Sequence, residues 1–223
     1  MLDPRDCTKG LVDLYWIPLG AGERFVRFNG KVYEAISALL GHRRRFDIFH
    51  TALEIMLPAG RFIVEMTPIP RTAGVERGVV AEGPVGVNAL GRFRVFRYEV
   101  RRWRDGVIPD VQYAVASPVR ITDDVVVTQQ VFDLLPAVPT AVWGRDELRA
   151  GEMWSCNSII SWTLAQAGID LRGVPLPTNA RAPGWDAGIR VARRDAHSVS
   201  EAAPFKGRDS RPAVKPDLRA PIS

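Results

Sequence analysis

The stretch that most constrains this chain runs from Trp154 to Gly168, where apolar residues recur at helical spacing. They fall at i, i+1, i+4, i+5 and i+8, which places them on one face of a helix: Ile159, Ile160, Thr163, Leu164 and Ala167. Ser155 or Asn157 can cap the start of this helix, and Gly168 can supply the left-handed residue that commonly ends one. We therefore predict a helix whose first turn contains or adjoins Cys156.

A cysteine at a helix start lies among unpaired backbone N–H groups and at the positive end of the helix dipole. Both effects lower the pKa of a thiol and favour the reactive thiolate. Such a nucleophile also needs a base, and among the three histidines (His42, His50 and His197) the best candidate is His50, which lies in an apolar, β-like segment. The opposing interpretation is that Cys156 is a small core residue, because free cysteine is among the most buried residue types.

The chain has 223 residues, 46% of them hydrophobic, which is enough for one sizeable domain. It contains no run of about 18 apolar residues, and its first residues are charged rather than an apolar signal core. We therefore expect a cytoplasmic protein without a transmembrane segment, in which Cys7 and Cys156 are free thiols. The histidines and cysteines are too scattered for a structural zinc site, and we expect no metal or cofactor.

Most of the net charge of +5 lies in the last 34 residues, 190–223, which carry +4. The body before them is nearly neutral, so we expect no specific nucleic-acid partner. The composition shifts to Pro, Arg, Ala and Ser toward this end of the chain. We predict one domain over residues 1–192 and a disordered basic tail over residues 193–223.

The rest of the chain alternates between β-like segments and helical ones. We predict strands at 11–18, 46–57, 61–66 and 92–103 and further helices at 32–40 and about 124–135. The glycine- and proline-rich segment 67–91 is expected to be mainly a long loop that covers a site, with a short strand at 79–80. The fold class is then α+β, with an antiparallel sheet packed against the helix that begins at Cys156.

This order of elements resembles the circularly permuted papain-like thiol enzymes, the NlpC-like group that includes lecithin:retinol acyltransferase-like proteins. The matching segments are 50–55, 62–66 and 154–160, and the resemblance spans about residues 11–171. It implies that Cys156 is the nucleophile, His50 the general base and Glu65 the residue that orients His50. Backbone N–H groups at the helix start would stabilise an oxyanion.

The role of Glu65 depends on the register of the hairpin between the second and third strands. A tight turn on Ala59 and Gly60 would place Glu65 opposite Glu54, about 13 Å along the strand from His50. Only a longer loop, from about residue 55 to residue 60, would bring Glu65 directly across from His50. Glu54, Thr67 or a backbone carbonyl could take the orienting role instead.

The activity implied by the resemblance is hydrolysis or transfer of an acyl group, from an amide or ester, through a Cys156 thioester. The substrate would be a peptide or a lipid acyl group, and the oligomeric state is open. The main alternative is a non-catalytic module on the same fold, whose groove binds a peptide, a lipid or a partner protein.

Overall fold

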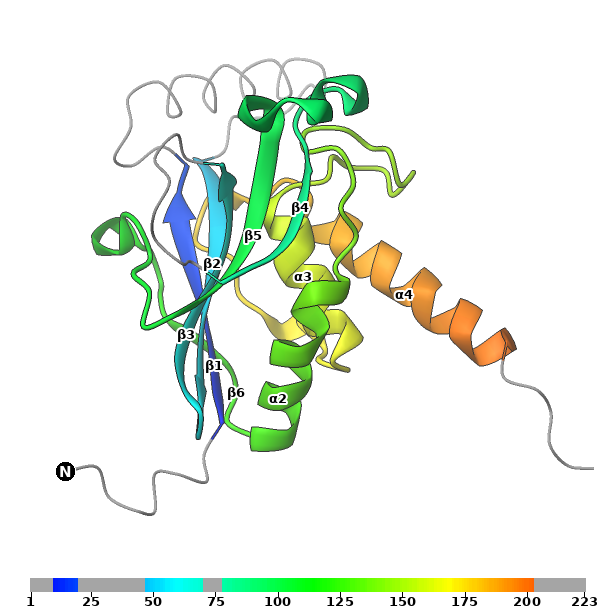
Figure 1. The fold of residues 1–223 in the computed structure, drawn as a ribbon. Helices are drawn as coiled ribbons and strands as arrows, with labels where there is room; N and C mark the ends of the chain where they lie inside the picture. Colours follow the sequence, from blue (N-terminus) through cyan, green and yellow to red (C-terminus); the bar gives the residue numbers. More distant parts are fainter. Residues whose placement is uncertain (1–9, 20–46, 70–77, 203–223) are drawn as a thin grey trace, which may run out of the picture.

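A computed structural model describes residues 10–19, 47–69 and 78–202, and within these residues seven strands form one sheet (Figure 1). The strands are β1 (Leu11–Pro18), β2 (Asp47–Leu57), β3 (Gly60–Pro68), β4 (Val79–Pro84), β5 (Arg97–Arg104), β6 (Val119–Thr122) and β7 (Ala180–Arg181). The order β4-β5-β3-β2-β1-β6 is antiparallel throughout, and β7 adds a short parallel pairing to β2. The predicted α+β class with an antiparallel sheet is therefore confirmed.

The described helices cover one face of this sheet (Figure 1). The α-helices are α2 (Val125–Leu134), α3 (Cys156–Gln166) and α4 (Trp185–Ala202). Short 3-10 turns are η2 (Asn88–Arg92), η3 (Arg94–Phe96), η4 (Val111–Tyr113), η5 (Leu135–Ala137) and η6 (Leu171–Gly173). None of the helices in the described ranges is long and apolar enough to cross a bilayer.

Strand alternation explains why the sheet has two apolar faces. On β2, the side chains of Phe49, Leu53 and Ile55 pack into the large cluster between the sheet and the helices. The intervening Ala52 belongs instead to a small cluster on the opposite face, with Ile17, Ile63 and Ile108. The segment before η4 therefore packs on the sheet face that α3 does not cover.

Helix α3 lies at the centre of the molecule and is buried on every side. The predicted core residues Ile160 and Leu164 are almost fully buried, and all nine positions from Cys156 to Leu164 are inaccessible to solvent or nearly so. The sequence pattern predicts burial of only one face of this helix. The structure buries the other face as well, because α4 packs against the side of α3 that we expected to be polar. Gly168, with φ of +80°, follows the helix as predicted.

The close contact between α3 and α4 requires glycine on α4. A Cβ added at Gly188 would collide with Ser161 Oγ and with the backbone oxygen of Ser158. Ser161 Oγ in turn donates a hydrogen bond of 2.7 Å to the backbone oxygen of Trp185. Small residues on both helices therefore let the two backbones approach and exchange polar contacts.

Three sequence-based expectations need correction. The strand predicted at 92–103 begins only at Arg97, because η2 and η3 occupy residues 88–96. The loop predicted at 67–91 contains strand β4, six residues long, paired with β5. The tail predicted from residue 193 begins inside α4, which continues to Ala202 and accepts a hydrogen bond from Trp162 Nε1 at Asp195. The helix predicted at 32–40 and residues 203–223 lie outside the described residues.

Candidate active site

The start of α3 docks against an edge of β2 that other strands leave open. Strand β7 pairs with β2 only at Asp47 and Ile48, and β3 pairs with it only from Leu53 to Leu57. Between these two pairings, residues 49–52 carry backbone groups that no described strand bonds on this side. The first residues of α3 fill that gap.

Asn157 forms the main link between α3 and this edge. Its Nδ2 donates to the backbone oxygens of Phe49 and Pro183, each at 3.0 Å, and its Oδ1 accepts from Thr51 Oγ1 at 3.1 Å. Asn157 therefore holds the residue before His50 and the residue after it. No sequence pattern pointed to this role, since Asn157 had been considered only as a cap.

The sulfur of Cys156 lies beside the same edge. The backbone N–H groups of Thr51, Asn157 and Cys156 itself face this sulfur and favour its anionic form. Because the N–H of Thr51 belongs to the peptide bond that joins it to His50, Cys156 lies about one peptide unit from the His50 backbone. The fold thus places the backbone of His50, but not its side chain, next to Cys156.

Burial nevertheless affects the pKa of the Cys156 thiol more than these N–H groups do. The residue is only 8% exposed, and desolvation raises the pKa of its thiol to about 11 despite the three N–H groups. The expectation that the helix start lowers this pKa is therefore wrong for the folded chain as it stands. At neutral pH, Cys156 is a protonated thiol.

His50 is half-buried in β2, paired with Ile17 of β1. Desolvation lowers the pKa of its imidazole to about 4, with an opposing effect from the charge of Asp110. At neutral pH the ring is therefore uncharged and able to accept a proton. His50 alternates along β2 with Phe49 and Thr51, so its side chain leaves the strand on the face opposite α3, and no hydrogen bond joins it to Cys156 among the described residues.

Glu65 does not contact His50 in the described structure. The hairpin turns tightly on Pro58 and Ala59, and its last β2–β3 pair is Leu53 with Val64, so Glu65 lies one residue beyond that ladder. Its carboxylate forms a buried ion pair of 2.9 Å with Arg101, which also pairs with Glu99. Burial raises the pKa of Glu65, and Arg101 opposes this shift.

The alternatives considered for the orienting role are also engaged elsewhere. Glu54 accepts hydrogen bonds from Tyr15 at 3.4 Å and from Arg61 at 3.1 Å. Thr67 Oγ1 donates to the backbone oxygen of its neighbour Pro68 at 3.4 Å. Neither side chain has a described contact with His50.

Asp110 is a residue near the site to which no sequence pattern points. It has a left-handed backbone with φ of 59° and precedes η4. Two residues earlier, Ile108 packs against Ile17 and Ala52 on the sheet face from which the His50 side chain leaves. This placement agrees with the effect of the Asp110 charge on the pKa of His50.

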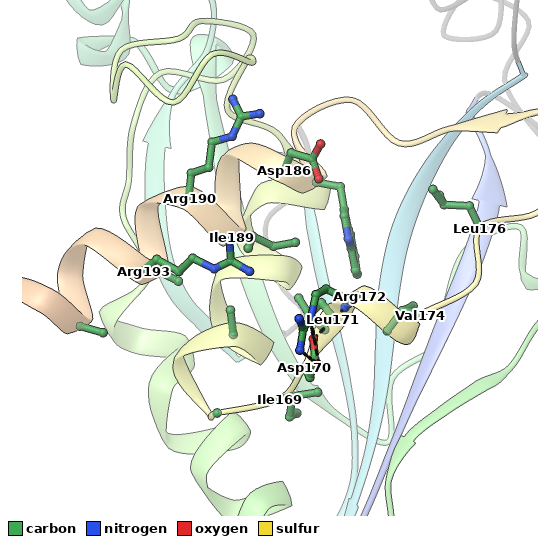
Figure 2. Close-up of a pocket in the computed structure, with 15 residues that line it drawn as sticks. Ile169, Asp170, Leu171, Arg172, Val174, Leu176, Asp186, Ile189, Arg190 and Arg193 are labelled. Carbon is green, nitrogen blue, oxygen red and sulfur yellow. Dashed lines mark hydrogen bonds and ion pairs between the residues drawn. The ribbon is translucent and has the colours of Figure 1, made fainter.

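A groove of about 650 Å³ lies at the other end of α3, between η6 and α4. Figure 2 shows its polar rim, where Arg172 pairs with Asp170 at 2.7 Å and Arg193 reaches toward them from α4. Apolar side chains, including Ile169 and Ile189, form the rest of its lining. None of the predicted site residues lines this groove.

Comparison with known proteins adds no further constraint. No protein-family model, curated protein or solved structure matches this chain.

Proposed function

We propose that the protein is a thiol-dependent hydrolase or acyltransferase, in which Cys156 forms a thioester and His50 is its base. The observation that supports this proposal is the docking of α3 on the open edge of β2, with the Cys156 sulfur beside the N–H of Thr51. This arrangement agrees with the permuted papain-like order of elements, and a peptide or lipid acyl group remains the proposed substrate.

The pKa values define the form in which the pair would react. With the pKa of Cys156 at about 11 and that of His50 at about 4, the resting state is a neutral thiol on the α3 side of β2 and a neutral imidazole on its other side, so the proposed proton transfer passes around the open edge of β2. As the sulfur attacks the acyl carbon, its proton passes to His50, which then gives it to the leaving amine or alcohol. Water or another acceptor next attacks the thioester and returns the thiol.

The backbone donors around the sulfur have a role in the same step. The N–H groups of Thr51, Cys156 and Asn157 face the Cys156 sulfur itself, so they stabilise the negative charge that appears on the sulfur as its proton leaves. Donors that are fixed before the reaction stabilise such charge without a cost of reorganisation. We assign the stabilisation of the ionised Cys156 sulfur to this cluster.

Asp110 suits the orienting role better than Glu65 does. Glu65 is committed to its ion pair with Arg101, whereas the charge of Asp110 raises the pKa of the His50 ring against the effect of burial. A carboxylate beside the imidazole would stabilise the imidazolium formed when His50 takes the thiol proton. Glu65 would then support the sheet rather than the reaction.

The test is acylation of the full chain by 4-nitrophenyl esters of short and medium acyl chains, followed by mass spectrometry. We expect one acyl group on Cys156, released by neutral hydroxylamine as a thioester is, and none in Cys156→Ser. His50→Gln should slow acylation by about 10²–10⁴-fold, the usual contribution of a general base. Cys7→Ser is the matched control and should be acylated like the unmodified chain.

The burial of Cys156 favours one alternative, a binding module in which this cysteine is a core residue. A thiol that is 8% exposed with a pKa of about 11 is a weak nucleophile unless a base assists it. Acylation on Cys7 alone, or a His50→Gln variant that is acylated at the unmodified rate, would establish this alternative and end the enzyme proposal.

A further inference from the structure

The connection between β4 and β5 exposes an unusual group of apolar side chains. This connection, residues 86–96, is here called the β4–β5 turn; it contains η2 and η3, and η3 buries none of its residues. Four of its large apolar side chains are between 40% and 64% exposed: Val87, Phe93, Val95 and Phe96. Scattered apolar residues are normal on a surface, but two phenylalanines and two valines in one short turn are typical of a contact surface.

The same turn is cationic. Arg92 and Arg94 are exposed, and residues 85–98 contain no aspartate or glutamate. The Arg92 guanidinium lies 4.8 Å from the centre of the Phe93 ring, so the cation and the aromatic ring are presented together. The neighbouring Arg97 differs, because it pairs with Glu82 at 3.0 Å. Within the described residues, Arg92 and Arg94 form no ion pair.

Backbone hydrogen bonds fix the β4–β5 turn relative to Cys156. Gly86 N donates to the oxygen of Trp143 at 3.0 Å, and Gly144 N donates to the oxygen of Trp154 at 2.9 Å. Trp154 precedes Cys156 by two residues, and Trp143 also forms an isolated β-bridge with Trp154. In Figure 1, η2 and η3 lie at the end of the sheet where β5 begins. The antiparallel order places the start of β2, and so His50, at that same end.

We propose that the β4–β5 turn binds the surface of an anionic lipid bilayer. Its apolar side chains would enter the boundary between headgroups and acyl chains, and Arg92 and Arg94 would contact lipid phosphate and carboxylate groups. Aromatic side chains flanked by cations are suited to this boundary, where one end of the contact is apolar and the other is wet and negatively charged. The binding itself does not depend on the thiol chemistry proposed above.

The bilayer is favoured over a protein partner by the way in which these groups are presented. The apolar groups come from one short turn at the end of the sheet, and the groove between η6 and α4 lies elsewhere. A fluid surface can accept several separate side chains without a matching shape. An anionic bilayer also supplies negative charge to Arg92 and Arg94, whereas the β4–β5 turn contains no acidic residue.

The experiment is co-sedimentation of the full chain with lipid vesicles. We expect binding to phosphatidylcholine vesicles that contain about 30% phosphatidylserine, weak binding to pure phosphatidylcholine, and a loss of binding as NaCl rises from about 0.1 M to about 0.5 M. The double change Phe93→Ser and Phe96→Ser should weaken binding by at least about tenfold. Arg92→Glu with Arg94→Glu should do the same without removing apolar surface.

Val126→Ser is the matched control, since Val126 is 62% exposed on α2, outside the turn. It should bind vesicles like the unmodified chain, and Cys156→Ser should also bind normally. The proposal is overturned if the full chain does not bind the phosphatidylserine vesicles, or binds pure phosphatidylcholine equally well. It is also overturned if both turn variants keep full binding, which would point to the basic residues after 202.

Discussion

The backbone N–H of Thr51 faces the sulfur of Cys156 across an edge of β2 that β3 and β7 leave uncovered. This relationship joins the second strand to the start of the central helix α3. It exists because β7 contributes only two residues to the sheet and β3 pairs with β2 only from Leu53 onward. The gap between the two pairings fits the first turn of a helix.

Asn157 should be the residue that holds this arrangement together. Asn157→Ala would remove side-chain hydrogen bonds to Phe49, Thr51 and Pro183, leaving buried polar groups without partners. We expect a loss of about 2–3 kcal/mol in the free energy of unfolding, measured by urea denaturation. The control Gln129→Ala removes an exposed hydrogen bond to Asp133 and should change stability by less than about 0.5 kcal/mol. Equal losses in the two variants would show that Asn157 does not link α3 to β2.

The contact between α3 and α4 should tolerate no side chain at Gly188. Gly188→Ala would drive a methyl group into Ser161 and the backbone at Ser158, so we expect a loss of about 1–3 kcal/mol or a partial separation of α4. Gly173→Ala is the control, because a Cβ there meets no atom within 4 Å. Thermal unfolding of both variants measures the difference, and a Gly188→Ala protein as stable as the control would mean that the helices lie farther apart.

His50 should make the protein less stable in acid. Its imidazole pKa is about 4 in the folded chain and 6.5 ordinarily, so between these values the unfolded state binds the proton more readily. The neutral His50 ring therefore contributes its full stabilisation above about pH 6.5. As pH falls toward 4, this contribution to the free energy of unfolding is lost, by at most about 3 kcal/mol.

The measurement is the stability of the unmodified chain minus that of His50→Gln, taken by urea denaturation from about pH 4 to pH 7. The subtraction removes the other titrating groups, such as Glu65, whose buried carboxyl has a raised pKa. A difference that stays constant across this range would show that the His50 ring is solvated.

Local patterns were sufficient to predict much of the fold. The alternation of apolar and polar residues in 11–18 and 46–66 predicts β1 and the β2–β3 hairpin. Asp124 lies at the predicted helix start and caps α2 by accepting hydrogen bonds from the backbone N–H groups of Val126 and Val127. Local patterns fail at residues 92–96. The alternating pattern in this segment suits a strand, but the structure has 3-10 turns with exposed apolar side chains.

The candidate site was less accessible to prediction because it depends on contacts between distant segments. The helix start at Cys156 is a local signal, whereas the burial that raises the pKa of its thiol arises in a core cluster that also contains residues of β3, β5 and α4. The two-residue pairing of β7 that opens the edge of β2 has no sequence pattern of its own. Asp110 lies two residues after Ile108, which packs on the His50 face of the sheet, and no local pattern indicates that placement.

The central claim, that His50 acts as the base for Cys156, is tested most directly by the pH dependence of Cys156 acylation. A neutral imidazole that takes the thiol proton is available at every pH well above 4, so the rate should be nearly constant from about pH 5 to pH 9. His50→Gln should lose this plateau, and its rate should rise about tenfold per pH unit, because only the rare thiolate can then react. Cys7 in the same sample should rise with pH up to the ordinary thiol pKa, near 8.5. A Cys156 rate that rises tenfold per unit in the unmodified chain, and is unchanged in His50→Gln, would contradict the claim.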